Sequence, residues 1–270
     1  MPSSSAAVES DGDPRVPEGE EEAQTGGALP LIKLDFQQLQ LKGYLTPISS
    51  ATVLAEEYRR LKRPIMRNAF GKGAVSVEYG NLVMVTSALP GEGKTFTALN
   101  LALSLAMERD TTVLMLDCDL VNPSLSRILG LADRPGLTDV LQDSGVEIQD
   151  VMFRTNFSKL RVVPAGQPHP QATELLTSEK MHRISAEFSR RYPDRIVLFD
   201  APPLLLSTQA AALSNFVGQV LVVVEAGRTE QRMIKEAISL LDEDKVVGMV
   251  LNKARRQLGG GYYGAYYGNS

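Results

Sequence analysis

The sequence predicts an α/β domain built on a doubly wound, mostly parallel sheet. From Leu82 onward, short apolar runs rich in β-branched residues alternate with longer amphipathic stretches, which is the pattern of parallel strands and crossover helices. The glycine-rich segment 87–95 directly follows one apolar run and leads into one amphipathic stretch. A phosphate-binding loop requires this placement between a strand and a helix. We therefore expect ligands to bind at the carboxyl ends of the strands.

The composition supports one globular domain with a polar extension. The chain has 270 residues, of which 43% are hydrophobic, and this is enough for one substantial core. Residues 1–30 hold seven acidic side chains and one arginine, a formal charge of -6, and the whole chain carries -4, which leaves +2 for the remainder. A nearly neutral domain lacks the strongly basic face of nucleic-acid binders. We expect no nucleic-acid partner.

Cysteine use and hydropathy indicate the compartment. The single cysteine, Cys118, cannot form an internal disulfide, and the two histidines lie at no zinc-binding spacing from it. The N-terminal segment is polar and acidic, and no apolar run approaches the ~20 residues of a membrane helix. We expect a cytoplasmic protein that is recruited to the inner face of the membrane by a partner.

The chain divides into four predicted regions. The first is too polar to offset the entropy of ordering it, so disorder is expected. In the second, apolar residues at helical spacing predict a helix over Ser50–Asn68, which Pro64 kinks or restarts. The regions are a disordered acidic tail (1–30), a linker with an oligomerisation helix (31–75), a P-loop domain (76–253) and a flexible Gly- and Tyr-rich tail (254–270).

The elements of the domain follow from its periodicity. Short apolar runs predict strands, and longer amphipathic stretches between them predict helices. The predicted strands are Leu82–Thr86, Thr112–Leu116, Leu160–Val163, Arg195–Phe199, Val217–Val224 and Val246–Leu251. The predicted helices are Thr95–Glu108, Ser124–Leu129, Ser178–Arg191 and Thr229–Leu241.

The segment from Ser87 to Thr95 predicts a P-loop NTPase of the deviant Walker A type. Its glycines let backbone N–H groups turn around an anion, Lys94 can reach the terminal phosphates of ATP, and Thr95 can bind Mg²⁺. The strict pattern begins with a glycine, where this chain has Ala88, and the alternative is a simple glycine-rich turn. The predicted nucleotide-binding residues are Pro90, Gly91, Glu92, Gly93, Lys94 and Thr95, with Asn252 at a strand end as a candidate purine contact.

Carboxylates follow two further predicted strands. Asp117 and Asp119 end one strand, where alternation places both on one side, and Asp200 ends another in the pattern of a Walker B motif. Beside a phosphate site, they can bind Mg²⁺ and accept a proton from an attacking hydroxyl. We assign Lys94 and all three aspartates to catalysis: Asp119 and Asp200 bind the metal with Thr95, and Asp117 is the base. Alone, such residues could instead cap the next helix.

The C-terminus concentrates aromatic residues. Half of the eight tyrosines lie in the last nine residues, between glycines, and a flexible tail of this kind can enter a catalytic cleft. The alternative is an aggregation-prone low-complexity tail without a role as an acceptor. In the second region, Glu57, Arg60 and Arg63 lie at i, i+3 and i+6 of the predicted helix, either as a solvated face or as an interface.

These motifs resemble the bacterial tyrosine kinases (BY-kinases), and in particular the separate cytoplasmic autokinases of exosortase-associated exopolysaccharide loci, from roughly Leu31 to the C-terminus. The resemblance implies an ATP- and Mg²⁺-dependent protein-tyrosine autokinase. It implies a ring-like homo-oligomer built through Glu57, Arg60 and Arg63, and a membrane chain-length-determinant or polysaccharide copolymerase as its activator in exopolysaccharide synthesis or export. The implied phosphorylation sites are Tyr262, Tyr263, Tyr266 and Tyr267.

Two other readings stay open. The chain departs from the BY-kinase pattern at Val121, where that family has arginine. A switch ATPase of the ParA or MinD class shares the loop, the fold and the carboxylates, but such proteins carry a signature lysine where this chain has Leu89, and a tyrosine tail has no role in them. A nucleotide-gated scaffold without phosphotransfer is the remaining alternative.

Overall fold

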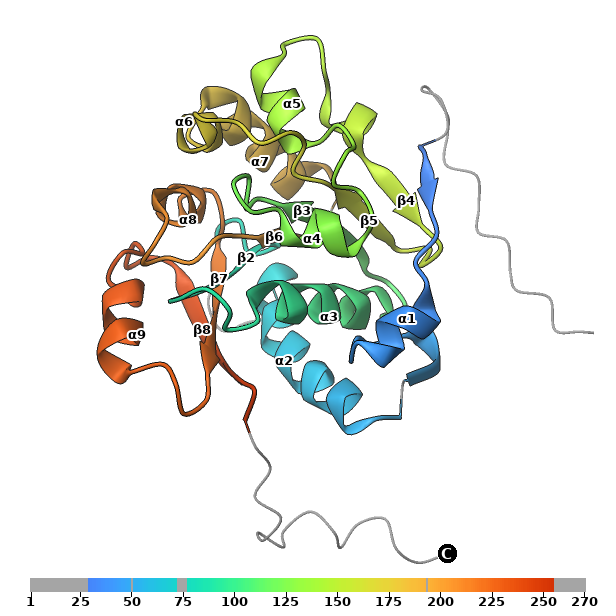
Figure 1. The fold of residues 1–270 in the computed structure, drawn as a ribbon, viewed down its shortest axis with the longest axis vertical. Helices are drawn as coiled ribbons and strands as arrows, with labels where there is room; N and C mark the ends of the chain where they lie inside the picture. The colour runs from blue at the N-terminus through green and yellow to red at the C-terminus, as the bar shows by residue number, and fades with distance from the viewer. Residues whose placement is uncertain (1–28, 50, 72–76, 193, 255–270) are drawn as a thin grey trace, which may run out of the picture.

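The computed structural model describes residues 29–49, 51–71, 77–192 and 194–254. Most of the predicted acidic tail and the four tail tyrosines lie outside these residues. One eight-stranded sheet forms in the order β1-β4-β5-β3-β6-β2-β7-β8 (Figure 1). Every neighbouring pair is parallel except β4 with β5, which confirms the mostly parallel α/β class. The strands are β1 (Leu31–Ile32), β2 (Leu82–Ser87), β3 (Thr112–Asp117), β4 (Phe153–Thr155), β5 (Leu160–Val163), β6 (Arg195–Asp200), β7 (Gln219–Glu225) and β8 (Val246–Asn252).

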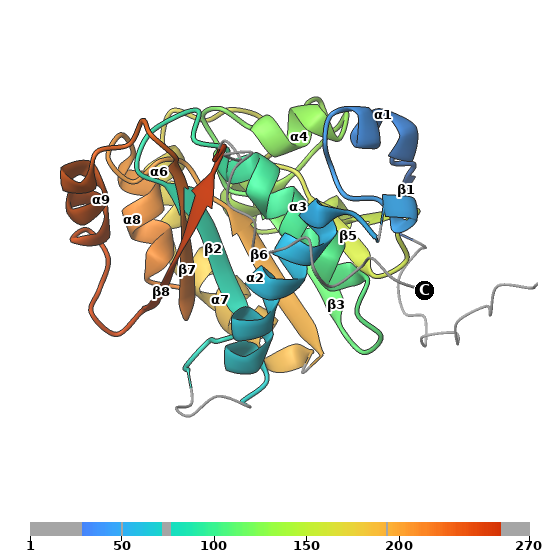
Figure 2. The ribbon, with the colours of Figure 1, turned by 90° about the horizontal axis from the view of Figure 1, so that it is seen from below.

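Helices cover both faces of the sheet (Figures 1 and 2). The buried side chains of α1 to α4 belong to the core on one face, and those of α5 to α9 to the core on the other. The doubly wound arrangement is therefore confirmed. The helices are α1 (Phe36–Leu41), α2 (Val53–Ala69), α3 (Lys94–Ala106), α4 (Ser124–Ile128), α5 (Leu137–Gln142), α6 (Ala172–Leu176), α7 (Glu179–Arg191), α8 (Thr208–Ser214) and α9 (Gln231–Ile238), with 3₁₀ turns at Pro47–Ser49 and Ile148–Val151.

Alternate residues of the central strands supply the two cores. In β2, Leu82 and Met84 pack toward α5–α9, whereas Val83 and Val85 pack toward α1–α4. Both faces of the strand are buried, which explains why its sequence is a continuous apolar run rather than an alternating pattern. The polar side chains of the central strands that could serve a site therefore lie at the carboxyl ends of those strands.

The register of the sheet brings three motifs to one edge. Asp117 at the end of β3 pairs with Asp200 at the end of β6, and Val85 of β2 lies opposite the same Asp200. The loop after β2 and both carboxylate motifs therefore lie side by side.

Helix α2 packs on the domain rather than standing apart from it. Tyr58 and Ile65 are buried in the core beneath it. The Lys62 ammonium donates to the carbonyl of Ser104 at 2.6 Å and lies 2.7 Å from the Glu108 carboxylate. The predicted restart at Pro64 is wrong, because the helix continues through it to Ala69. Pro64 is exposed, so water can satisfy the carbonyl that loses its helical partner.

Several short elements were not predicted. Strands β1 and β4 and helices α1, α5, α6 and α8 are only two to seven residues long, too short for a clear period. Among the described residues, no helix combines the length and the apolar character needed to cross a membrane.

Candidate nucleotide-binding and active site

The loop after β2 adopts a conformation that its glycines permit. Gly91 and Gly93 have φ of 82° and 96°, in the left-handed region that other residues rarely adopt. Helix α3 begins at Lys94, so its free N–H groups and the positive end of its dipole are available to an anion held by the loop. A Cβ at Gly93 would also collide with the side-chain amide of Asn252. The loop geometry therefore suits a phosphate.

The Glu92 side chain holds the loop against the sheet. Its nearly buried carboxylate accepts hydrogen bonds from the backbone N–H of Leu89 at 2.6 Å, from the N–H of Glu225 at 3.3 Å and from the hydroxyl of Thr229. These bonds connect the loop to the end of β7. The Glu92 side chain is therefore engaged within the protein, and its contact with nucleotide stays a prediction.

The end of β8 supports the same loop. Asn252 donates its side-chain amide to the carbonyl of Glu92 at 2.8 Å, and the Lys253 ammonium donates to the carbonyl of Gly91 at 2.6 Å. Lys253 also pairs with Glu225 at 3.0 Å. Asn252 does not line the pocket, so its purine contact stays a prediction. Nothing in the sequence pattern had indicated the role of Lys253.

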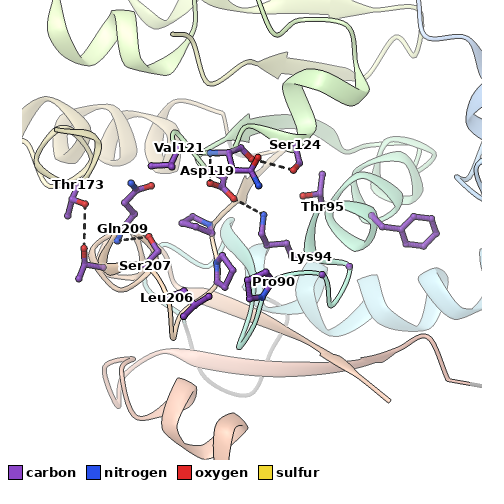
Figure 3. Close-up of a pocket in the computed structure, with 17 residues that line it drawn as sticks. Pro90, Lys94, Thr95, Asp119, Val121, Ser124, Thr173, Leu206, Ser207 and Gln209 are labelled. Carbon is purple, nitrogen blue, oxygen red and sulfur yellow. Dashed lines mark hydrogen bonds and ion pairs between the residues drawn. The ribbon is translucent and has the colours of Figure 1, made fainter. Parts of the chain in front are cut away.

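Lys94 and Asp119 form the charged centre of the pocket (Figure 3). The Lys94 ammonium lies 3.0 Å from Oδ2 of Asp119, and both side chains are nearly buried. Burial acts to lower the pKa of Lys94, but the charges of Asp200, Asp119 and Asp117 outweigh it and raise that pKa above its usual value. Lys94 is therefore protonated at neutral pH, as a phosphate contact requires.

Asp117 lies behind this centre and is fully buried. Ser126 donates to its Oδ2 from both the backbone N–H and the hydroxyl, each at 2.8 Å, and the N–H of Asp119 makes a longer 3.3 Å bond to Oδ1. Burial and the charge of Asp200 raise the pKa of Asp117 to about 7. β3 ends at Asp117, and only Asp119, in the following loop, lines the pocket. The placement of both aspartates on one side stays a prediction, although the charges of both act on Lys94.

Asp200 gives the clearest indication of a cation. It has no exposed surface, and neither carboxylate oxygen has a hydrogen-bond partner among the described residues. Burial raises its pKa to about 6, although the nearby Lys94 charge and Thr95 hydroxyl act to lower it. A buried carboxylate is costly without a partner.

The donor set fits Mg²⁺. Thr95 and Asp119 line the pocket, and Asp200 lies close enough to Lys94 and Thr95 for both to act on its pKa. Across the described ranges, no group of three or more His, Cys, Asp or Glu side chains is arranged for a metal. Mg²⁺ needs none, because it takes one or two carboxylates together with phosphate oxygens and water.

The Asp200→Asn variant is expected to be more stable than the wild type when Mg²⁺ is removed. The folded-state pKa of about 6 lies above the ordinary value of about 4, so the stability that Asp200 contributes is greatest at low pH and is lost as the pH rises through 6. At pH 8 in EDTA, we expect a free energy of unfolding higher by about 1–2 kcal/mol. The gain should shrink toward pH 5, as urea unfolding at both pH values can show.

The matched control is Asp242→Asn, at an exposed position, which should change little at either pH. A loss of stability in Asp200→Asn at pH 8 would contradict the electrostatic account.

The pocket has a volume of about 600 Å³. It is lined by the phosphate loop, by Phe96 and by residues that follow β3 and β6. Sequence reasoning missed several of the lining residues because they lie outside any motif. They are Phe96, Ser124, Thr173, Pro202, Pro203, Leu206, Ser207, Thr208 and Gln209.

The structure brings the predicted Pro90, Gly91, Gly93, Lys94, Thr95 and Asp119 together on this pocket. The candidate interface residues Glu57, Arg60 and Arg63 are exposed on α2 and do not line it. Their role stays a prediction.

Comparisons with known proteins agree with the fold and the loop. Residues 78–168 match the ParA model, described as NUBPL iron-transfer P-loop NTPase. The crystal structure of the chimerical protein CapA2B2 aligns with a TM-score of 0.67 and 25% identity, over 84% of this chain and 94% of that one. The cell division ATPase MinD of Pyrococcus furiosus aligns with a TM-score of 0.53 and 25% identity, over 63% of this chain and 70% of that one.

Two curated relatives show the family to which this chain belongs. Tyrosine-protein kinase Wzc of Salmonella typhimurium is 33% identical over 69% of this chain, which spans about a quarter (26%) of Wzc. Tyrosine-protein kinase YwqD of Bacillus subtilis is 32% identical over 78% of this chain and 86% of its own length. Because the second match covers most of both proteins, the chain belongs to the bacterial tyrosine-protein kinase family.

Proposed function

We propose that this chain is an ATP:protein-tyrosine phosphotransferase that modifies its own C-terminal tail. The observation that carries the proposal is the buried Lys94–Asp119 pair in a pocket walled by the phosphate loop. The described chain ends at Ala254, one residue beyond the lysine that contacts this loop. The acceptors start eight residues further on, within about 30 Å of extended chain. They are Tyr262, Tyr263, Tyr266 and Tyr267.

The residues of the pocket would divide the work of phosphate transfer. Backbone N–H groups of residues 91–95 bind the β- and γ-phosphate oxygens of ATP. Lys94 turns from Asp119 toward these oxygens and stabilises the charge that develops there. Thr95, Asp119 and Asp200 would hold Mg²⁺, which would neutralise phosphate charge. The chain thereby positions the γ-phosphoryl group for in-line attack.

Asp117 is the proposed base for the tyrosine hydroxyl. Its pKa of about 7 suits proton transfer near neutral pH, and the two bonds from Ser126 orient its carboxylate. Oδ1, which accepts one long bond, is the oxygen to receive the proton. Asp117 does not line the pocket, so the hydroxyl must reach past Asp119.

Assembly and partners are part of the same proposal. Glu57, Arg60 and Arg63 on the exposed side of α2 would join copies into a ring in which one copy presents its tail to the next. A membrane chain-length-determinant or polysaccharide copolymerase would recruit and activate the kinase in exopolysaccharide synthesis or export, a role that rests on family membership alone. Each phosphate adds a charge of about -1.5 to -2, which would release the tail and loosen the ring.

After incubation with Mg·ATP, mass spectrometry of the full-length protein should find phosphotyrosine in the last nine residues. The control is the full-length chain with all four tail tyrosines replaced by phenylalanine, which keeps the pocket and removes the acceptors. ATP hydrolysis with an unmodified tail would favour the switch ATPase. Nucleotide binding without turnover would favour the nucleotide-gated scaffold.

A further inference from the structure

We infer that Val121 and Leu206 form an apolar seat for the ring of the acceptor tyrosine. The inference rests on the proposed function and adds how the acceptor is selected. Val121 follows β3, and Leu206 lies between β6 and α8. Although 66% and 67% exposed, both line the pocket that holds Lys94 and Asp119. Figure 3 shows both on the side of the pocket away from Thr95.

The backbone around both side chains is tied to the strand ends. Leu204 and Leu205 donate their N–H groups to the carbonyls of Ser87 at 2.8 Å and Ala88 at 3.3 Å. Next to Val121, the N–H of Asn122 donates to Oδ1 of Asp119 at 3.0 Å. These bonds fix the backbone next to Val121 and Leu206.

Further apolar residues contribute to the wall of the same pocket. They are Pro202 and Pro203, and the hydroxyl of Thr86 donates to the Pro202 carbonyl at 2.7 Å. Single exposed apolar residues are ordinary, but several on one concave site mark a surface that a ligand covers. A phenol ring suits such a wall, because it buries apolar area and leaves its hydroxyl free to point at the phosphate.

Charge identifies the occupant as the chain's own tail. Among the described residues that line the pocket, the charged ones are Lys94 and Asp119, which pair with each other. Residues 257–270 contain four tyrosines and no charged side chain. In the proposed mechanism Mg·ATP engages both of these side chains, so a strongly charged peptide would lose hydration without gaining an ion pair with them, whereas a neutral aromatic segment would not. The pocket therefore selects its acceptor by apolar contact.

The test uses a full-length chain whose four tail tyrosines are replaced by serine, so that its own tail does not compete. The substrate is a synthetic peptide of residues 257–270, whose phosphorylation is followed at saturating Mg·ATP. In this background, the double change Val121→Ser and Leu206→Ser is expected to raise the KM for the peptide about tenfold. The change should lie in KM rather than kcat, because contacts to the ring are the same in the ground state and the transition state.

Leu240→Ser is the matched control, since Leu240 is an exposed apolar residue outside the pocket, and its KM should match the parent. An unchanged peptide KM in the double variant would overturn the inference. An equal loss of ATP affinity would overturn it too, by showing general damage to the pocket. Failure of the parent enzyme to phosphorylate the peptide, with the wild-type tail also unmodified, would instead refute the proposed function and this inference with it.

Discussion

Replacing Lys94 with methionine is expected to reduce tail phosphorylation by at least about a hundredfold. Methionine keeps the apolar part of the side chain but removes the charge that would stabilise the γ-phosphoryl group during its transfer. The same change leaves the buried Asp117, Asp119 and Asp200 without the cation that offsets them. The rate of phosphotyrosine formation at saturating Mg·ATP measures the effect on transfer separately from binding.

Lys235→Met is the matched control, because Lys235 lies exposed on α9 and should retain the wild-type rate. If Lys94→Met kept more than a tenth of that rate, Lys94 would not be the residue that stabilises the transferred phosphate. Nucleotide binding by the variant would show whether the loop itself remained intact.

The Glu92→Ala variant should lose about 3 kcal/mol of unfolding free energy together with most of its ATP affinity. The change removes one acceptor group from three donors, the N–H groups of Leu89 and Glu225 and the hydroxyl of Thr229. Buried donors that lose their acceptor each cost about 1–3 kcal/mol. Without this clamp, the phosphate loop is also no longer held in its binding conformation.

Urea unfolding and nucleotide titration can follow both effects of this change. Glu92→Gln keeps one acceptor oxygen and should be intermediate, while Glu243→Ala, at an exposed position, should resemble the wild type. Full ATP affinity in Glu92→Ala would show that the loop holds its shape without the clamp.

The central part of the fold was predictable from local sequence. Strands such as β2 and β6 match their predicted ranges to within a residue, because most of each strand is apolar and buried on both faces. The two-residue β1 pairs with β4, more than a hundred residues away, and no local period records such a contact. The packing of α2 on the domain could not be predicted from local sequence either, because Lys62 contacts residues that lie on and just after α3, far away in the sequence.

Site residues could be predicted where they belong to a short local motif. They could not be predicted where the fold brings together side chains that are distant in the sequence. The loop glycines and Asp200 follow from strand–loop–helix order and from the end of an apolar run. By contrast, Ser126 and Lys253 contact Asp117 and Gly91 across nine and 162 positions. Val121 could be recognised as a departure from a family pattern, but its place on the pocket wall required the structure.

The buried Asp200 also bears on how long the protein survives in a cell. Its carboxylate has no hydrogen-bond partner among the described residues, so part of the stability of the folded chain depends on what the pocket contains. A ligand at a hundred times its dissociation constant stabilises the folded state by about 2.7 kcal/mol. We expect proteases, which act on opened chains, to remove the empty form first, so that the supply of Mg·ATP governs the abundance of the protein as well as its turnover.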